Sequence, residues 1–201
     1  MRALVLADRP FHADPRTLVE QHHLDAVLCL GDLQPSWLEA LDRVRVPKLG
    51  VRGNHDAEPS YLELFGVEDV HLRRVELDGG TSVCGFEGCV AYHRDRGEHG
   101  PTYTQRQAAR LARKLPSADV LICHCPPSGV NDDPQDPAHV GFEALRDWVL
   151  AQRPRVLLHG HTHPHPGGLV GRLGATRVVY VNGARVVDLG TAAPPGEHSP
   201  P

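Results

Sequence analysis

The sequence predicts an α/β protein built around a mostly parallel sheet, and three observations support this prediction. Short apolar segments suited to buried strands alternate with helical segments along the chain. Polar side chains follow five of these strand segments at the point where each one ends. A length of 201 residues is enough for one domain with a sizeable core. We therefore expect a single domain over residues 1–190, followed by a disordered, Pro-rich tail over residues 191–201.

The amino-terminal part of the chain predicts a regular alternation of strand and helix. Asp14 is a suitable N-cap for a helix, and Pro15 suits the first helical position because it needs no N–H partner there. The expected strands are 3–7, 26–30 and 48–51, and the expected helices are 14–24 and one that runs through 37–41. Strand, helix, strand, helix and strand at this spacing indicate parallel strands with crossover helices.

The pattern changes after residue 70. Residues 70–77 alternate between apolar and polar side chains, and Asp78-Gly79-Gly80 can form a turn. Residues 81–86 would then form a second strand that runs back beside the first. This pattern predicts an antiparallel hairpin. Further along, we expect strands at 119–123 and 155–159, helices at about 104–115 and 142–152, and more hairpin strands over 169–189.

The composition is that of an ordinary globular protein that does not enter a membrane. Hydrophobic residues make up 40% and charged residues 23% of the chain, and the net charge of -4 argues against a broad nucleic-acid-binding face. The apolar start of the chain is shorter than the ~7–15 residues of a signal peptide core. No segment approaches the ~20 apolar residues of a membrane span. The 14 histidines are unusually many and favour metal binding.

The five cysteines indicate a reducing compartment. Their number is odd, and three of them lie inside apolar strand segments. We therefore expect reduced core thiols and a cytoplasmic location, although Cys84 and Cys89 could pair across the hairpin.

The residues at the ends of the strands predict a metal site. Since ligands bind at the carboxyl ends of parallel strands, side chains distant in sequence should converge there. Polar turns alone could explain any single one of these segments. Two carboxylates, a carboxamide and several imidazoles suit Mn²⁺, Fe or Zn²⁺ better than Mg²⁺ alone, and they suffice for two ions that share a carboxylate. The residues are Asp8, Asp32, Asn54, His55, His124, His161 and His163.

These blocks resemble the calcineurin-like metallophosphoesterases. The resemblance is carried, in order, by Asp8, Gly31-Asp32, Gly53-Asn54-His55-Asp56, His124 and Gly160-His161-Thr162-His163, and it runs from Leu4 to Val187. The stretches 124–132 and 139–142 are similar to small phosphoesterases of this superfamily. The resemblance implies a four-layer α/β/β/α sandwich, which accommodates both the parallel strands and the hairpins.

The resemblance also implies a role for each matching residue. Asp32 would bridge two divalent transition-metal ions, for which we expect Mn²⁺, with Fe or Zn²⁺ as alternatives. Asp8 and His163 would hold the first ion, and Asn54, His124 and His161 the second. His55 would act as the general acid, with Asp56 keeping its ring oriented.

The first block departs from the family pattern. The family usually has Asp-x-His there, whereas this chain has Asp8-Arg9-Pro10, so one imidazole of the first metal is absent. His12 could take its place, although Pro10 restricts the turn. His139 is the other candidate, as a substitute ligand or as a contact to the substrate phosphate. A subgroup of the superfamily has this Asp-only first block, and whether one or two ions bind at rest stays open.

The function indicated is hydrolysis of a phosphoester by attack of a metal-bound hydroxide, with His55 as general acid. A small phosphodiester is favoured over a phosphomonoester and over nucleic acid, because the chain lacks an obvious capping domain for nucleic acid. A metal-binding scaffold or regulator with little turnover is an alternative, and a nuclease is another. The natural substrate and the oligomeric state stay open.

Overall fold

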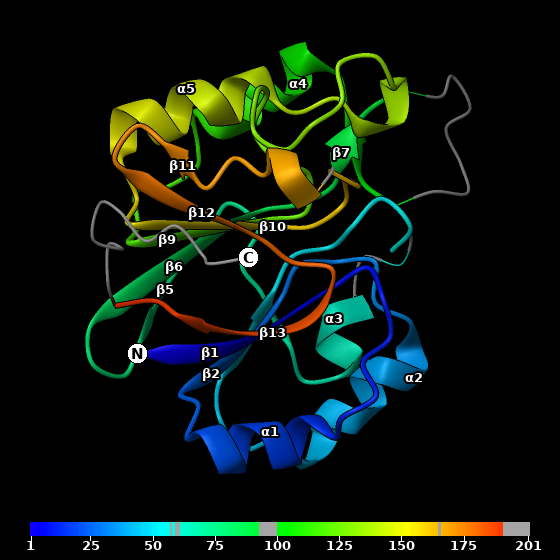
Figure 1. Cartoon of the computed structure of the whole chain (residues 1–201), viewed down its shortest axis with the longest axis vertical. Helices are drawn as coiled ribbons and strands as arrows, with labels where there is room; N and C mark the ends of the chain where they lie inside the picture. The colour runs from blue at the N-terminus through cyan, green and yellow to red at the C-terminus, as the bar shows by residue number, and fades with distance from the viewer. Residues whose placement is uncertain (57, 59–60, 93–99, 165, 191–201) are drawn as a thin grey trace.

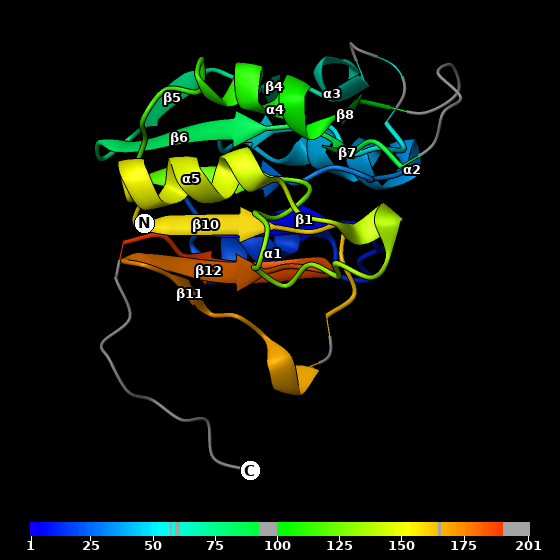
Figure 2. The ribbon, with the colours of Figure 1, turned by 90° about the horizontal axis from the view of Figure 1, so that it is seen from above.

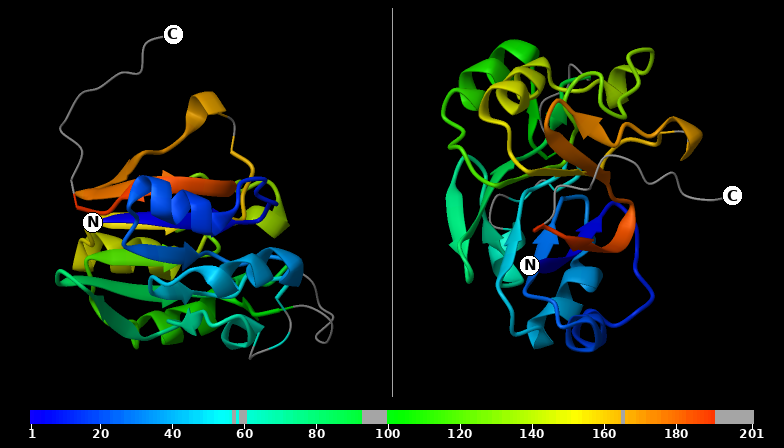
Figure 3. Two further views of the ribbon diagram at one scale, coloured as in Figure 1. Left: turned by 90° about the horizontal axis from the view of Figure 1, so that it is seen from below. Right: turned by 60° about the vertical axis from the view of Figure 1, so that its left-hand side comes forward.

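Two β-sheets pack face to face and carry helices on their outer faces (Figure 1). This computed structural model describes residues 1–56, 58, 61–92, 100–164 and 166–190, so the predicted tail at 191–201 lies outside the described residues. In Figure 3, the green and yellow helices α4 and α5 lie on the opposite side of the sheets from the blue helices α1 and α2. The four-layer α/β/β/α sandwich implied by the family resemblance is confirmed.

The first sheet holds three of the predicted parallel strands. Its order is β13-β1-β2-β3-β4, and β13 at the edge is its antiparallel member. The strands are β1 (Arg2–Ala7), β2 (Ala26–Cys29), β3 (Lys48–Gly50), β4 (Glu68–Asp69) and β13 (Gly183–Asp188).

The second sheet has the order β11-β12-β10-β9-β6-β5. Strands β12, β10, β9 and β6 run parallel to one another, and the edge strands β11 and β5 are antiparallel to their neighbours. The strands are β5 (Arg74–Leu77), β6 (Thr81–Phe86), β9 (Val120–Cys123), β10 (Val156–His159), β11 (Arg172–Leu173) and β12 (Thr176–Tyr180). A separate two-stranded ribbon pairs β7 (Cys89–Val90) with β8 (Thr102–Tyr103).

Helices α1 and α4 begin at residues that cap them with their side chains. Asp14 accepts a hydrogen bond from the N–H of Thr17 at the start of α1, and Thr104 forms a capping box with Gln107 at the start of α4. The helices and short 3₁₀ turns are α1 (Pro15–His22), α2 (Pro35–Leu38), η1 (Glu39–Arg43), α3 (Tyr61–Leu64), α4 (Gln105–Ala112), η2 (Pro137–His139), α5 (Glu143–Gln152) and η3 (Pro166–Gly168).

Alternation along the central strands divides the core into three layers. Val5 and Ala7 of β1 belong to the apolar cluster between the sheets, whereas Leu4 and Leu6 belong to the cluster under α1, α2 and η1. A third cluster joins the second sheet to α4 and α5, and Trp148 lies within it. Because both faces of each sheet are covered, the central strands are continuously apolar.

Three details of the sequence prediction were wrong. The five strands with polar ends do not share one sheet, since β1, β2 and β3 lie in the first and β9 and β10 in the second. Strands β12 and β13 do not form a hairpin, because the chain crosses from one sheet to the other between them. Strand β5 begins at Arg74, as a turn at Leu72 with φ of 55° occupies the residues before it. The short elements α3 and β4 were not predicted.

The structure also bears on a possible disulfide and on membrane-spanning helices. All five cysteines are free and buried, so Cys84 and Cys89 do not form a disulfide. Among the described helices, none has the length and apolar character needed to cross a bilayer.

Candidate metal centre

The candidate site lies where strands of both sheets end. Figure 2 shows β6, β10 and β12 of the second sheet pointing towards one end of the molecule. The residues that follow β1, β2 and β3 meet those that follow β9 and β10, since Asp8 accepts a hydrogen bond from the main chain of His161 and His124 contacts Asn54. Two sheets, rather than the edge of one, therefore supply the site.

Three of the predicted ligands adopt an uncommon backbone conformation. Asp8, Asp32 and His161 have φ of 59°, 53° and 66°, in the left-handed region that residues other than glycine seldom adopt. Each follows its strand almost immediately, so the left-handed turn redirects the side chain at the end of the strand. Such residues cost about 1–3 kcal/mol each and cluster at functional sites. The strain at these three residues is therefore consistent with their acting as ligands of a shared ion.

Two glycines permit the close approach of these loops. A Cβ at Gly53 would lie 2.0 Å from Oδ1 of Asp32, and a Cβ at Gly160 would lie 2.5 Å from Oδ2 of Asp8. Both separations are far below van der Waals contact. The glycine that precedes each ligand segment therefore makes room for a carboxylate from a different strand.

His124 is the centre of the cluster. It is fully buried, and its Nδ1 lies 2.9 Å from the carbonyl oxygen of Leu30. Its Nε2 lies 3.0 Å from Oδ1 of Asn54 and 3.3 Å from Oδ2 of Asp32. Both ring nitrogens thus face oxygen acceptors, which favours the doubly protonated imidazolium.

The charges of the cluster favour a cation. Burial alone would lower the pKa of His124, but the carboxylates of Asp32 and Asp8 raise this pKa to about 9. Burial alone would raise the pKa of Asp32, yet His124 and the N–H of His55 hold it at about 2. For Asp8, burial outweighs the opposing effects of His124 and of the N–H of His161, so its pKa is raised. Two carboxylates around a buried imidazolium would stabilise a divalent ion in place of the proton.

Asp8, Asp32 and His124 can meet on one ion. One ligand atom from each residue lies within 4.8 Å of the others among the described residues. Asn54 is 2% exposed, and its side-chain oxygen contacts Nε2 of His124 beside these atoms. Carboxylate, carboxamide and imidazole donors match the preferences of Mn²⁺, Fe and Zn²⁺, so the residues fit the metal that the family resemblance implies.

A row of imidazoles extends from the cluster. The ring centre of His161 lies 4.8 Å from that of His124, and the ring centre of His139 lies 5.3 Å from those of His161 and His163. Nε2 of His161 lies 2.8 Å from the carbonyl oxygen of Ala138, which leaves Nδ1 as its candidate ligand atom. Burial lowers the pKa of His161 to about 3, so its ring is neutral as a ligand requires.

His163 lies further out than we expected for a ligand. Its side chain is exposed, and it lines a second cavity together with His139 and Thr162. The structure therefore brings Asp8, Asp32, Asn54, His124 and His161 together and places His163 at the rim.

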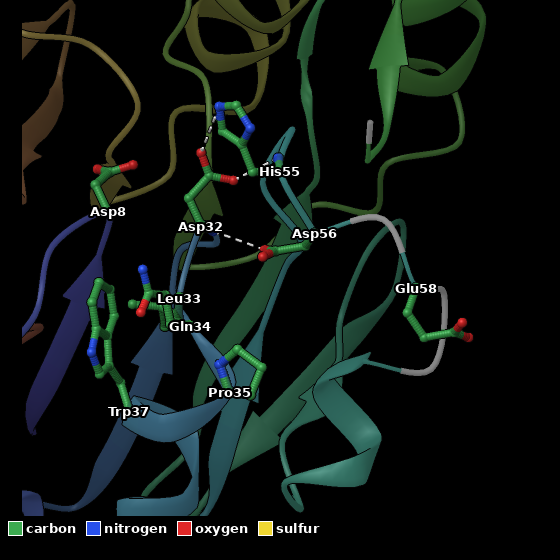
Figure 4. Close-up of a pocket in the computed structure, with 9 residues that line it drawn as sticks. All are labelled: Asp8, Asp32, Leu33, Gln34, Pro35, Trp37, His55, Asp56 and Glu58. Carbon is green, nitrogen blue, oxygen red and sulfur yellow. Dashed lines mark hydrogen bonds and ion pairs between the residues drawn. The ribbon is translucent and has the colours of Figure 1, made fainter. Parts of the chain in front are cut away.

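His55 lies over Asp32 at the mouth of another cavity (Figure 4). Its main-chain N–H donates to Oδ1 of Asp32 at 2.9 Å, and its ring Nε2 lies 4.0 Å from Oδ2 of the same carboxylate. The His55 side chain is 65% exposed, so it can reach a substrate bound beside the carboxylate. This position suits a proton donor to a leaving group.

Our prediction that Asp56 orients the ring of His55 was wrong. Oδ2 of Asp56 accepts hydrogen bonds from the main-chain N–H groups of Gly53 and Asp32, at 2.7 and 2.8 Å. Figure 4 shows this carboxylate turned towards Asp32, away from the imidazole of His55. Asp56 therefore joins the loop after β3 to the loop after β2. Burial raises its pKa to about 6.

Replacing Asp56 should consequently affect stability. Asp56→Ala leaves two main-chain N–H groups without their acceptor in a buried region, and we expect the free energy of unfolding to fall by about 2–4 kcal/mol. Asp56→Asn retains a side-chain oxygen that can accept a hydrogen bond, so its free energy of unfolding should fall by less. Urea denaturation of the metal-free protein measures this change. The exposed Asp42→Ala is the control, and an equal effect of both alanine variants would refute the role assigned to Asp56.

Within the described part of the chain, His139 is the one of the two candidates for the missing imidazole that contacts other predicted site residues. Its Nδ1 lies 2.6 Å from Oδ2 of Asp136, and this hydrogen bond lowers the pKa of Asp136. A carboxylate on one ring nitrogen fixes the orientation and leaves Nε2 for a metal or a phosphate. His12 is exposed in the segment between β1 and α1.

Several groups that shape the site were not predicted. The carbonyl groups of Leu30 and Ala138 position imidazoles, and main-chain groups of this kind leave no signal in a sequence. Asn131 binds Nε2 of His159 and both main-chain polar groups of Val170, so it anchors a loop. Its left-handed φ of 56° also depends on the folded context.

Comparisons with known proteins identify the family and agree with the fold. The calcineurin-like phosphoesterase superfamily domain matches residues 1–201. One crystal structure aligns with a TM-score of 0.67 at 16% identity, over 89% of each chain. The crystal structure of TT1561 of Thermus thermophilus aligns with a TM-score of 0.63 at 18% identity, over 89% of this chain and 88% of that one, and these two likenesses show the fold. No curated protein sequence matches. Because the family domain covers the whole chain and the fold agrees, the chain belongs to the calcineurin-like phosphoesterase superfamily.

Proposed function

We propose that the protein hydrolyses a small phosphodiester with the help of two divalent transition-metal ions, Mn²⁺ foremost. Membership of the superfamily indicates a metal-dependent phosphoesterase in general, and it implies divalent ions. The observation that supports the proposal most is the cluster formed by Asp8, Asp32 and the buried His124, with Asn54 against it. When bound, such ions lower the pKa of a coordinated water and neutralise charge on the phosphoryl oxygens.

The protein's own residues would divide the remaining work. Asp32, with its lowered pKa, stays ionised and would help to hold both ions. Asp8 and His163 would serve one ion, and His124 and His161 would join Asn54 at the other. Leu30 keeps the Nδ1 proton of His124 in place, so that Nε2 can bind metal. His55 would give a proton to the departing oxygen, because it is exposed beside Asp32.

His139 would contact a phosphoryl oxygen of the substrate. Asp136 occupies its Nδ1, and its ring lies between those of His161 and His163. A partly buried imidazole in this position can donate a hydrogen bond through Nε2.

We also place the protein in the cytoplasm, where its free buried cysteines would stay reduced.

Metal dependence tests the proposed function directly. Bis-p-nitrophenyl phosphate and p-nitrophenyl phosphate would be assayed with Mn²⁺, with and without a chelator. We expect Mn²⁺-dependent hydrolysis that favours the diester, and loss of this activity in Asn54→Ala. The exposed Asp42→Asn is the control for damage to the fold. Activity that ignores the chelator, or an Asn54→Ala variant with full activity, would refute the proposal.

A metal-binding scaffold remains the second candidate, because the first block offers Asp8 without the family's imidazole. Metal content measured by mass spectrometry separates the two candidates. One tightly bound ion, together with no turnover of any ester tested, would favour the scaffold.

A further inference from the structure

The cavity beside the metal centre extends well beyond the candidate ligands. It has a volume of about 470 Å³, within the roughly 300–1,000 Å³ range of small-molecule sites. Asp8, Asp32 and His55 are among the residues that line one part of it, and Leu33, Pro35 and Trp37 are among those that line another (Figure 4). A phosphoryl group held at the carboxylates through metal would therefore direct one of its ester groups along Trp37.

Trp37 offers a flat face to this space. It packs against the apolar cluster under the first sheet and stays partly exposed, so the core does not enclose the whole indole. Figure 4 shows the indole and the ring of Pro35 on two sides of the segment Leu33-Gln34, below Asp8 and Asp32. A planar group gains more from such a surface than a flexible chain does, because stacking fixes few rotatable bonds.

Gln34 adds a polar group where local structure gives no reason for it. It is the N-cap of α2, yet its side chain makes no capping hydrogen bond. Asp14 and Thr104 cap α1 and α4 with their side chains, as these residue types normally do. Gln34 instead lines the cavity beside Trp37, with an amide that can both donate and accept. Local rules are commonly broken at functional sites.

The charges of the cavity exclude a second phosphate as the group beside Trp37. Of the described residues that line it, none is Lys or Arg, and Glu58 adds a carboxylate. A neutral ring with a hydrogen-bonding edge fits a tryptophan face, an amide and an absence of cations. Gln pairs with the edge of adenine through both polar atoms of its amide.

We propose that this cavity binds a nucleobase, so that the substrate is a nucleotide phosphodiester, with Trp37 stacking on the base and Gln34 bonding to its edge. This assignment rests on the proposed phosphoesterase function, which supplies the anchored phosphoryl group. It makes Trp37 and Gln34 specificity-determining residues.

Calorimetric binding of a matched pair of probes tests the assignment. Adenosine 5′-monophosphate and ribose 5-phosphate share the phosphate and the sugar and differ by the base. With Mn²⁺-loaded full-length protein, we expect the nucleotide to bind about tenfold more tightly or better, in line with base–aromatic stacking elsewhere. Trp37→Leu should remove this preference, Trp37→Phe should keep most of it, and Gln34→Leu should reduce it.

Trp148→Phe is the matched control, because Trp148 lies in the distant cluster under α5 and should not affect the preference. Equal binding of the two probes to the wild type, or a preference that survives Trp37→Leu, would overturn the assignment. Ester hydrolysis without a base preference would refute the nucleobase alone. Metal-loaded protein that binds neither probe and hydrolyses no ester would refute the proposed function with it.

Discussion

Replacement of Asp32 by Asn is expected to lower kcat/KM for Mn²⁺-dependent diester hydrolysis by about 10³-fold or more. The lowered pKa of Asp32 keeps it ionised at every pH of interest, and it lies 3.3 Å from Nε2 of His124. Asn has the same shape and can still accept the hydrogen bond from His55, so the loop should keep its conformation. The substitution would therefore remove the negative charge of Asp32, which two cations would share.

Metal content distinguishes this explanation from a general loss of structure. Asp32→Asn should bind less Mn²⁺ by mass spectrometry, with an unchanged far-UV circular dichroism spectrum. Asp42→Asn makes the same chemical change on the exposed surface of η1 and should retain wild-type activity and metal. An Asp32→Asn variant that keeps a tenth of the activity with full metal content would show that this carboxylate is not shared between ions.

The fold could be predicted where local chemistry determines the backbone. Asp14 and Pro15 define the start of α1 in the sequence as in the structure, and the apolar segments locate β1, β2, β9 and β10. Which strands pair is a different question, because a strand that is buried on both faces has the same apolar pattern in either sheet. Pairing follows from the packing of Val5 and its neighbours between the sheets, which involves residues far apart in the chain.

The site was easier to predict by residue than by interaction. Polar side chains after strands stand out in a sequence, so Asp8 and His124 could be selected before their contact was known. The hydrogen-bond partners of Asp56 could not be predicted, because main-chain N–H groups are present at every position except proline. Trp37 was not selected either, since a tryptophan near a helix is equally compatible with a core residue.

Replacement of His55 by Gln should reveal its role through the leaving group. A general acid is typically worth about 10²–10⁴ in rate when the departing oxygen needs a proton. We therefore expect kcat/KM for diphenyl phosphate to fall by about 10²-fold or more. For bis-p-nitrophenyl phosphate the loss should be below about tenfold, because p-nitrophenolate is stable enough to leave without a proton.

The comparison of two esters within one variant separates proton donation from positioning. If His55 acts by holding Asp32 through its main-chain N–H, Gln should preserve that bond and neither ester should be affected. If its ring contributes only charge near the phosphoryl group, both esters should lose rate equally. His22→Gln, an exposed histidine in the last turn of α1, controls for the substitution itself. Only a loss that grows with the basicity of the leaving oxygen identifies His55 as the proton donor, and equal losses would exclude it.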